Sequence, residues 1–234
     1  MLRSTPISVV SPGRSKQEFS NRSAFAALKE DGSVITWGRS SSGGDSSSVA
    51  EQLSSGVVQI FSNGFAFAAL KDDDSVVTWG TSGWGGDSSS VADQLSSGVI
   101  KVFSNSGAFS ALKDDGSIVT WGSTNHAGDS SSVADQLSSG VVQIFSTVNS
   151  FAALKDDGSV ISWGESDWGG DSSRVADQLK SGVVQLFSTH SAFAALKDDG
   201  SVILWGSPSG GDSTRIFDQL SSGVVKIFST VSAF

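Results

Sequence analysis

Serines and aspartates are plentiful in this 234-residue chain, but it has only two histidines, and Cys and Tyr are absent. The two histidines, His126 and His190, fall in different segments, so the sequence offers no obvious Ser-His-Asp set with a base beside a nucleophile. Acidic pairs such as Asp114-Asp115 could give oxygen ligands to calcium, but they lack the alternating spacing of a calcium-binding loop. The sequence therefore predicts a non-catalytic protein with no metal and no other cofactor.

Recognition by aromatic side chains is the stronger candidate chemistry. Trp84, His126 and Trp168 share one position of an internal repeat, five residues beyond a constant tryptophan. If neighbouring units place equivalent residues on one rim, these rings form an arc, and aromatic rings are enriched at binding hot spots. A second variable loop adds Phe65 and Arg22 as predicted contacts. The alternatives are that the rings only cover a loop and that the second loop varies by drift.

The repeat that positions these residues is about 42 residues long and occurs five times. We expect an N-terminal arm at 1–14 and one repeat domain at 15–234, with units at about 15–56, 57–98, 99–140, 141–182 and 183–223, and a closing or extra strand at 224–234. Short units cannot bury an apolar face alone and must stack on neighbours. The constant tryptophans are therefore expected in the core between units: Trp37, Trp79, Trp121, Trp163 and Trp205.

Each unit reads as three strands and a short helical turn. In AFAALKEDGSVITWG, residues 24–38, two apolar runs flank Asp-Gly, which accepts positive φ at both central positions of a two-residue hairpin turn. Unit two has Asp73-Asp74 instead, so its turn is expected to be the most strained. A first strand precedes each hairpin, at 57–62, 99–104, 141–146, 183–188 and 224–229. Before it, DSSSVADQLSSG predicts a turn or two of helix anchored by a leucine: Leu53, Leu95, Leu137, Leu179 or Leu220.

Alternation along the strands decides the fold class. Ala24, Ala26 and Leu28 share one face of a strand, and Phe25 and Ala27 share the other, so neither face is polar. Small apolar residues on both faces indicate a sheet packed closely between similar sheets. The prediction is an all-β fold, a β-propeller or propeller arc of five roughly 42-residue blades, each with three to four antiparallel strands and a short helical turn between blades. A β-solenoid is the alternative.

The segment VVQLFSTHSAFAALKDDGSVILWG, residues 183–206, resembles the repeat of the regulator of chromosome condensation family. It is also similar to the repeat of the bacterial propeller inhibitors of β-lactamase, in the same superfamily. The resemblance covers about residues 16–234 and implies a β-propeller. The chain departs from the family in having Gly-Gly-Asp-Ser-Ser after its Trp-Gly pairs and five units where members usually close with seven blades. A closed ring and an open arc both remain, and the family's guanine-nucleotide-exchange activity is not implied.

Charge and hydropathy limit the classes of partner and the cellular locations that we expect. A net charge of -9 repels phosphate backbones, so nucleic acid is not an expected partner. No apolar run approaches the roughly 20 residues that cross a bilayer, and the N-terminus lacks an apolar stretch of about 7–15 residues typical of a signal peptide. We expect a soluble chain, intracellular or organellar, with peripheral association with a membrane complex left open.

The expected function is a non-catalytic protein-interaction scaffold, an accessory or structural subunit of a larger assembly that binds through its rim loops. The alternative is a carbohydrate-binding propeller in which Trp84 and Trp168 stack on sugar rings. An enzyme ranks third, because no convergent acid–base pair is visible.

Overall fold

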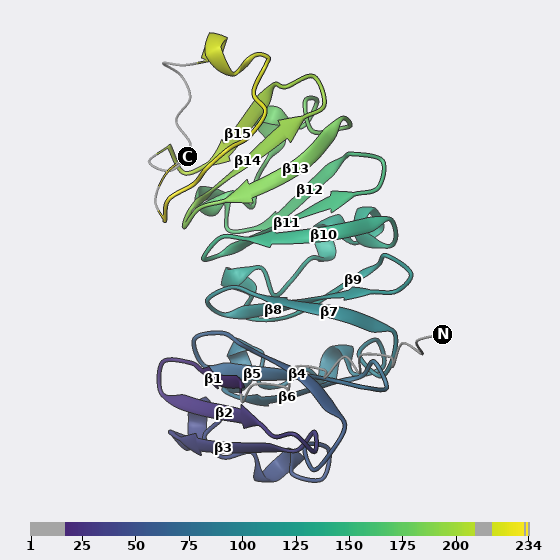
Figure 1. Ribbon diagram of the computed structural model, residues 1–234, viewed down its shortest axis with the longest axis vertical. Coiled ribbons are helices and arrows are strands. Elements are labelled where there is room, and N and C mark those ends of the chain that lie inside the picture. The colour runs from purple at the N-terminus through teal and green to yellow at the C-terminus, as the bar shows by residue number, and fades with distance from the viewer. Residues whose placement is uncertain (1–16, 209–216, 232, 234) are drawn as a thin grey trace, which may run out of the picture.

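The computed structural model describes residues 17–208, 217–231 and 233, and these form five three-stranded antiparallel sheets (Figure 1). Each sheet takes three consecutive strands, with the second strand in the middle. The all-β prediction is confirmed, with three strands in each blade. The expected arm at 1–14 lies outside the described residues. None of the described helices is long and apolar enough to cross a membrane.

The strands follow the repeat. The first sheet contains β1 (Gln17–Ser20), β2 (Ala24–Leu28) and β3 (Val34–Gly38). The second contains β4 (Val57–Ser62), β5 (Ala66–Lys71) and β6 (Val76–Gly80). The third contains β7 (Val99–Ser104), β8 (Ala108–Lys113) and β9 (Ile118–Gly122). The fourth contains β10 (Val141–Ser146), β11 (Ser150–Lys155) and β12 (Val160–Gly164). The fifth contains β13 (Val183–Ser188), β14 (Ala192–Lys197) and β15 (Val202–Gly206).

Short 3₁₀ helices fill the connections between sheets. Directly after a third strand come η1 (Ser40–Ser42), η3 (Ser82–Trp84), η5 (Thr124–His126) and η7 (Ser166–Trp168). Before the next first strand come η2 (Ser47–Val49), η4 (Ser89–Val91), η6 (Ser131–Leu137) and η8 (Ser173–Val175), and η9 (Phe217–Leu220) occupies the equivalent place after the fifth sheet. The expected helical turns are thus present. Their leucine anchors Leu53, Leu95, Leu137 and Leu179 are buried, whereas Leu220 is half-buried.

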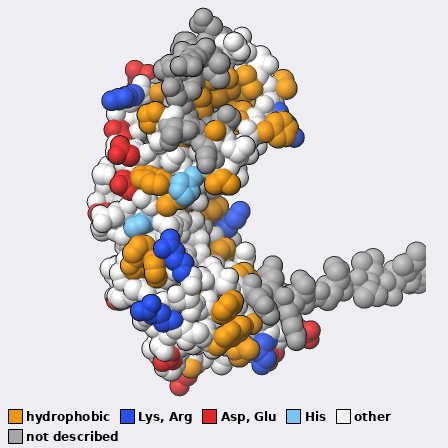
Figure 2. Space-filling model, turned by 90° about the vertical axis from the view of Figure 1, so that its left-hand side faces the viewer, with side chains coloured by type: hydrophobic (Ala, Val, Ile, Leu, Met, Phe, Trp, Pro, Cys, Tyr) orange, Lys and Arg blue, Asp and Glu red, His pale blue; other side chains and the backbone are white. Residues whose placement is uncertain are grey.

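The five sheets are stacked in an open arc. In Figure 1 the first sheet and the fifth sheet lie at opposite ends of the stack, and the outline in Figure 2 is bowed. The described residues therefore show the open-arc alternative and do not form a closed ring.

The core lies between neighbouring sheets. Phe67 and Trp79 face each other across β5 and β6 with stacked rings, 5.3 Å between centroids, and pack with Ala24 and Ala26 of the first sheet. Alanine-sized side chains allow the sheets to approach closely, which keeps both faces dry. Four constant tryptophans are buried, and each indole Nε1 donates a hydrogen bond to a carbonyl oxygen of the preceding unit at 3.1–3.2 Å: Trp79 to Gly43, Trp121 to Gly85, Trp163 to Ala127 and Trp205 to Gly169.

Trp37 corrects the expectation of a buried tryptophan in every unit. It stacks on Phe25 at 5.4 Å but is 42% exposed. The reason is that, within the described residues, no sheet packs on the outer side of the first one, so no carbonyl oxygen meets its indole.

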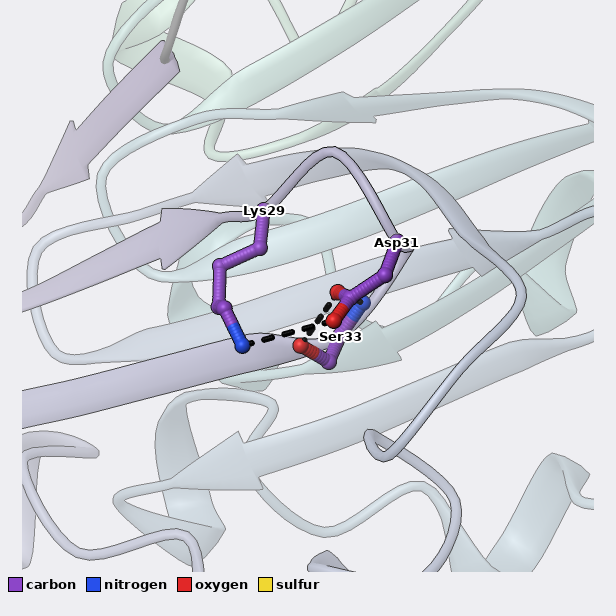
Figure 3. A network of polar contacts seen from close by, with 3 residues as sticks. All are labelled: Lys29, Asp31 and Ser33. Carbon is purple, nitrogen blue, oxygen red and sulfur yellow. Dashed lines mark hydrogen bonds and ion pairs between the residues drawn. The ribbon is translucent and has the colours of Figure 1, made fainter.

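The hairpin turn differs from the expected two-residue type. Among the Asp-Gly pairs only the glycine has positive φ, as at Gly32 (φ 77°), because the loop is one residue longer. Gly32 N–H donates to Lys29 O, and Lys29 N–H donates to Ser33 O, which is a type I turn closed by a left-handed residue. Asp31 Oδ1 accepts both the amide and the hydroxyl of Ser33, and Lys29 Nζ lies 3.4 Å from Oδ2 (Figure 3). In unit two, Asp74 occupies the position of this glycine at φ 62°. This left-handed conformation is strained for a residue other than glycine, as expected from the sequence.

The prediction of a strand at 224–229 is wrong. The segment carries no strand assignment, although Val224 N–H donates to Gly200 O and Ile227 packs on the fifth sheet. The physical reason is that every first strand pairs only with the second strand of its own unit, and no such second strand is present among the described residues.

Candidate interaction rim

Both variable positions of the repeat lie on one edge of the stack. The loop between the first and second strands is tied to the 3₁₀ helix that follows the third strand by a side-chain amide. Asn63 Nδ2 donates to Trp84 O and Asn105 Nδ2 donates to His126 O, both at 2.6 Å. Asn63 Oδ1 also accepts the amides of Phe65 and Ala66 and so fixes the loop. In the fourth unit a threonine replaces the asparagine, and Thr147 Oγ1 donates to Trp168 O at 2.9 Å.

A backbone ladder runs along this edge from unit to unit. Each rung is an amide that donates to the equivalent carbonyl oxygen of the next unit: Arg22 to Gly64, Gly64 to Ser106, Ser106 to Val148 and Val148 to His190, at 3.0–3.3 Å. Hydrogen-bonded backbones lie about 5 Å apart, whereas stacked sheets lie about 10 Å apart. The five units therefore converge at this edge and bring their loop side chains close together.

The side chains on this edge form a row of contacts. The guanidinium carbon of Arg22 lies 5.2 Å from the centroid of the Phe65 ring. The Phe65 and Trp84 rings are 4.4 Å apart, and the Trp84 and His126 rings are 4.8 Å apart, both tilted. Gly107 allows this approach, because a Cβ there would meet Trp84 at 2.6 Å and His126 at 2.8 Å.

Trp168 does not join the row formed by Trp84 and His126. It contacts His190 of the fifth unit, edge to face, with 5.2 Å between centroids. Between His126 and Trp168 in chain order lies Glu165, whose carboxylate accepts a hydrogen bond from Asn149 Nδ2. The expected arc of three rings is therefore divided into two groups, one containing Trp84 and His126 and the other containing Trp168 and His190. We call the set Arg22, Phe65, Trp84, His126, Trp168 and His190 the aromatic rim.

His190 was not among the residues expected to bind a partner, and no contact between the two variable loops was predicted. In the first three units the signal that joins the two loops is the asparagine before the first of them, whose side chain donates to a carbonyl oxygen 21 residues further on.

The aromatic rim is open to solvent. Phe65, Trp84, His126 and Trp168 are half-buried, and Arg22 and His190 are exposed. Figure 2 shows both histidines on one face of the molecule, each beside hydrophobic side chains, with basic side chains near the lower one.

His126 has the geometry of a local turn contact. Ser123 Oγ lies 2.8 Å from its Nδ1, and both belong to the turn that begins η5. Burial lowers the pKa of His126 and so favours the neutral ring, and the nearby Glu165 carboxylate partly offsets this effect. Within the described residues no carboxylate hydrogen-bonds to His126 and no group of acidic or histidine side chains could hold a metal. A Ser-His-acid set is not assembled there.

Comparison with protein-family models and with curated proteins finds no match. Among solved structures, human WBSCR16 is similar at 19% identity and a TM-score of 0.48, with 80% of this chain and 60% of that chain covered. Prp20p, the RCC1 protein of Saccharomyces cerevisiae, is similar at 20% identity and a TM-score of 0.48, with 80% and 56% covered. The ectodomain of the receptor kinase CR4 from Physcomitrella patens is similar at 14% identity and a TM-score of 0.46, with 80% and 50% covered.

This chain therefore spans 50–60% of the length of these proteins. The similar structures also include yeast RCC1 bound to Kap60 and the CRINKLY WD40 ectodomain of the receptor kinase ACR4 from Arabidopsis thaliana.

Proposed function

We propose that this chain is a non-catalytic protein-interaction scaffold, an accessory or structural subunit of a larger assembly, and that it binds its partner through the aromatic rim. The observation that carries the proposal is the unbroken row from Arg22 through Phe65 and Trp84 to His126. Three units contribute to it, on loops and 3₁₀ helices rather than on the strands that form the core.

Residue types and placement support binding over simple loop packing. Tryptophan and arginine dominate binding hot spots, because they combine large contact area with a polar group. Here they stand on loops that the backbone ladder and the asparagine ties hold rigid, so little conformational entropy is lost on association. The constant positions of the repeat serve the core, whereas the rim positions differ from unit to unit and define one particular surface.

The carbohydrate-binding alternative fits the rim less well. Stacking on a sugar needs an open indole face, and Trp84 already contacts the rings of both Phe65 and His126. Trp168 contacts one ring, so it keeps more free surface.

Affinity capture from an extract of the source cells tests the proposal, with wild type compared with a Trp84→Ser, Trp168→Ser double variant and with Arg22→Glu. Ile100→Ser is the matched control, because Ile100 is 54% exposed on β7, away from the rim. Proteins that wild type and the control retain should be lost on both rim variants, with all variants melting as folded proteins. The same proteins retained on all four would refute the rim as binding surface. Glycan-array binding lost on Trp168→Ser would favour the carbohydrate alternative.

A further inference from the structure

Charge changes sign along the rim. In the first unit Arg22 and Arg39 are exposed, and in the fourth unit Glu165 and Asp167 are exposed. Arg39 and Glu165 are equivalent residues, since each is the N-cap of the 3₁₀ helix that follows its third strand. The intervening equivalents, Thr81 and Ser123, are uncharged.

These charges are available to a partner. Within the described residues the ion pairs join other side chains, and none of Arg22, Arg39, Glu165 and Asp167 takes part in one. Arg39 Nε donates to the neighbouring Ser41 hydroxyl, Arg22 lies over Phe65, and the Glu165 carboxylate accepts a hydrogen bond from Asn149 Nδ2. Between the basic end and the acidic end stand Phe65, Trp84 and His126.

We propose that the rim binds an extended peptide segment with an acidic side chain at one end, apolar side chains in the middle and a basic side chain at the other end. The inference rests on the proposed function and names the chemistry of its partner. The acidic group meets Arg22 and Arg39, the apolar groups cover Phe65 and Trp84, and the basic group meets Glu165 and Asp167. Trp168, next to Asp167 in η7, adds an aromatic face for that cation.

The ladder sets the spacing of the pattern. From Arg22 to Val148 are three rungs of about 5 Å each, or about 15 Å, and an extended peptide rises about 3.3 Å per residue. The acidic and basic residues of the partner are therefore about four to six positions apart. Two clusters of opposite sign also orient the peptide and exclude segments of uniform charge.

Selection from a random nine-residue peptide library displayed on phage tests this inference with the whole chain as target. The binding of selected peptides is then measured by fluorescence anisotropy on wild type, on Trp84→Ser, on Arg22→Glu with Arg39→Glu, and on a control with Arg174→Glu and Lys180→Glu. The control makes the same change of net charge at two exposed residues outside the rim. Thermal melting verifies that each variant is folded.

The expected peptides share the acidic–apolar–basic pattern. Their affinity should fall about 3- to 10-fold on the Arg22, Arg39 variant, as expected for reversing exposed charge pairs, and should stay within about 2-fold on the control. Adding Glu165→Lys and Asp167→Lys to the Arg22, Arg39 variant should restore binding, because the peptide can then lie in the opposite direction.

The contrary outcomes separate the two proposals. The inference would be overturned by selected peptides that lose affinity on Trp84→Ser but share no charge pattern. It would also be overturned by peptides whose affinity falls equally on the Arg22, Arg39 variant and on the control. In both cases the rim would remain a binding surface. Peptides that bind wild type and Trp84→Ser equally would overturn both. Failure to select any peptide would exclude an extended peptide as the partner.

Discussion

Ser110 is a polar residue in the apolar core, and replacing it with alanine is predicted to stabilise the protein. It lies in the middle of β8, fully buried between sheets, and its hydroxyl has no hydrogen-bond partner among the described residues. The equivalent residue in the other four units is alanine: Ala26, Ala68, Ala152 and Ala194. The repeat itself therefore shows that the site accommodates a methyl group.

The magnitude follows from the hydroxyl alone. A buried polar group without a partner costs about 1–3 kcal/mol, whereas alanine at the same position leaves only the small void of one missing oxygen. Ser110→Ala should therefore raise the free energy of unfolding by about 1–2 kcal/mol. The reciprocal change, Ala68→Ser, should lower it by a similar amount.

Ser150→Ala is the matched control. Ser150 is also fully buried at the start of β11, but its hydroxyl donates to Glu165 O at 2.9 Å. Removing that bond should cost about 0.5–1.5 kcal/mol, the opposite sign from Ser110→Ala.

Equilibrium unfolding in urea, followed by tryptophan fluorescence and far-ultraviolet circular dichroism, gives the three free energies. Coincident transitions and equal m-values are required, because stacked repeats do not always unfold in two states. A Ser110→Ala protein with unchanged or reduced stability at equal m-value would refute the desolvation argument.

Three further predictions follow from the fold. Asp74→Gly should raise the free energy of unfolding by about 0.5–1 kcal/mol in urea titrations, because it removes an L-residue from the left-handed region; a loss would show that Asp74 is not strained. Trp121→Ala should cost about 3–5 kcal/mol and Trp37→Ala clearly less, since only Trp121 is buried and bonded to the preceding unit; equal losses in the same titrations would contradict this. The hydroxyl and amide of Ser33 hold the pKa of Asp31 at about 2, below its unfolded value, so its stabilising effect is complete above about pH 4 and is lost as pH falls toward 2. Urea titrations from pH 5 to pH 2 should show that decline, and Asp31→Ala should make it shallower; an unaltered pH profile in the variant would count against it.

The fold was readable from the sequence because the same apolar pattern occurs five times. Ala66, Phe67 and Ala68 alternate between the two faces of β5 and are all fully buried, so neither face of this inner sheet meets solvent, and a constant tryptophan requires a neighbouring unit to bury it. The turn was misjudged because Asp-Gly permits two hairpin types, and the serine that follows decides between them by bonding the aspartate.

The rim was readable only in part. The rings of Trp84 and His126 belong to different units, and equivalent repeat positions predicted that they are neighbours. The contacts of Phe65 with Trp84, and of Trp168 with His190, join different positions of the repeat. Those contacts depend on how far the sheets converge at one edge, which is a property of the stack as a whole.

The ladder of amides between units also determines how the arc can deform. The hydrogen bonds that form the rungs tolerate little stretching, whereas apolar side chains packed between the sheets can slide and separate gradually. Tightening or relaxing the curvature must therefore pivot about the ladder, with the largest displacements at the far ends of the blades. The spacing of Arg22, Phe65 and Trp84 therefore changes little when the arc flexes.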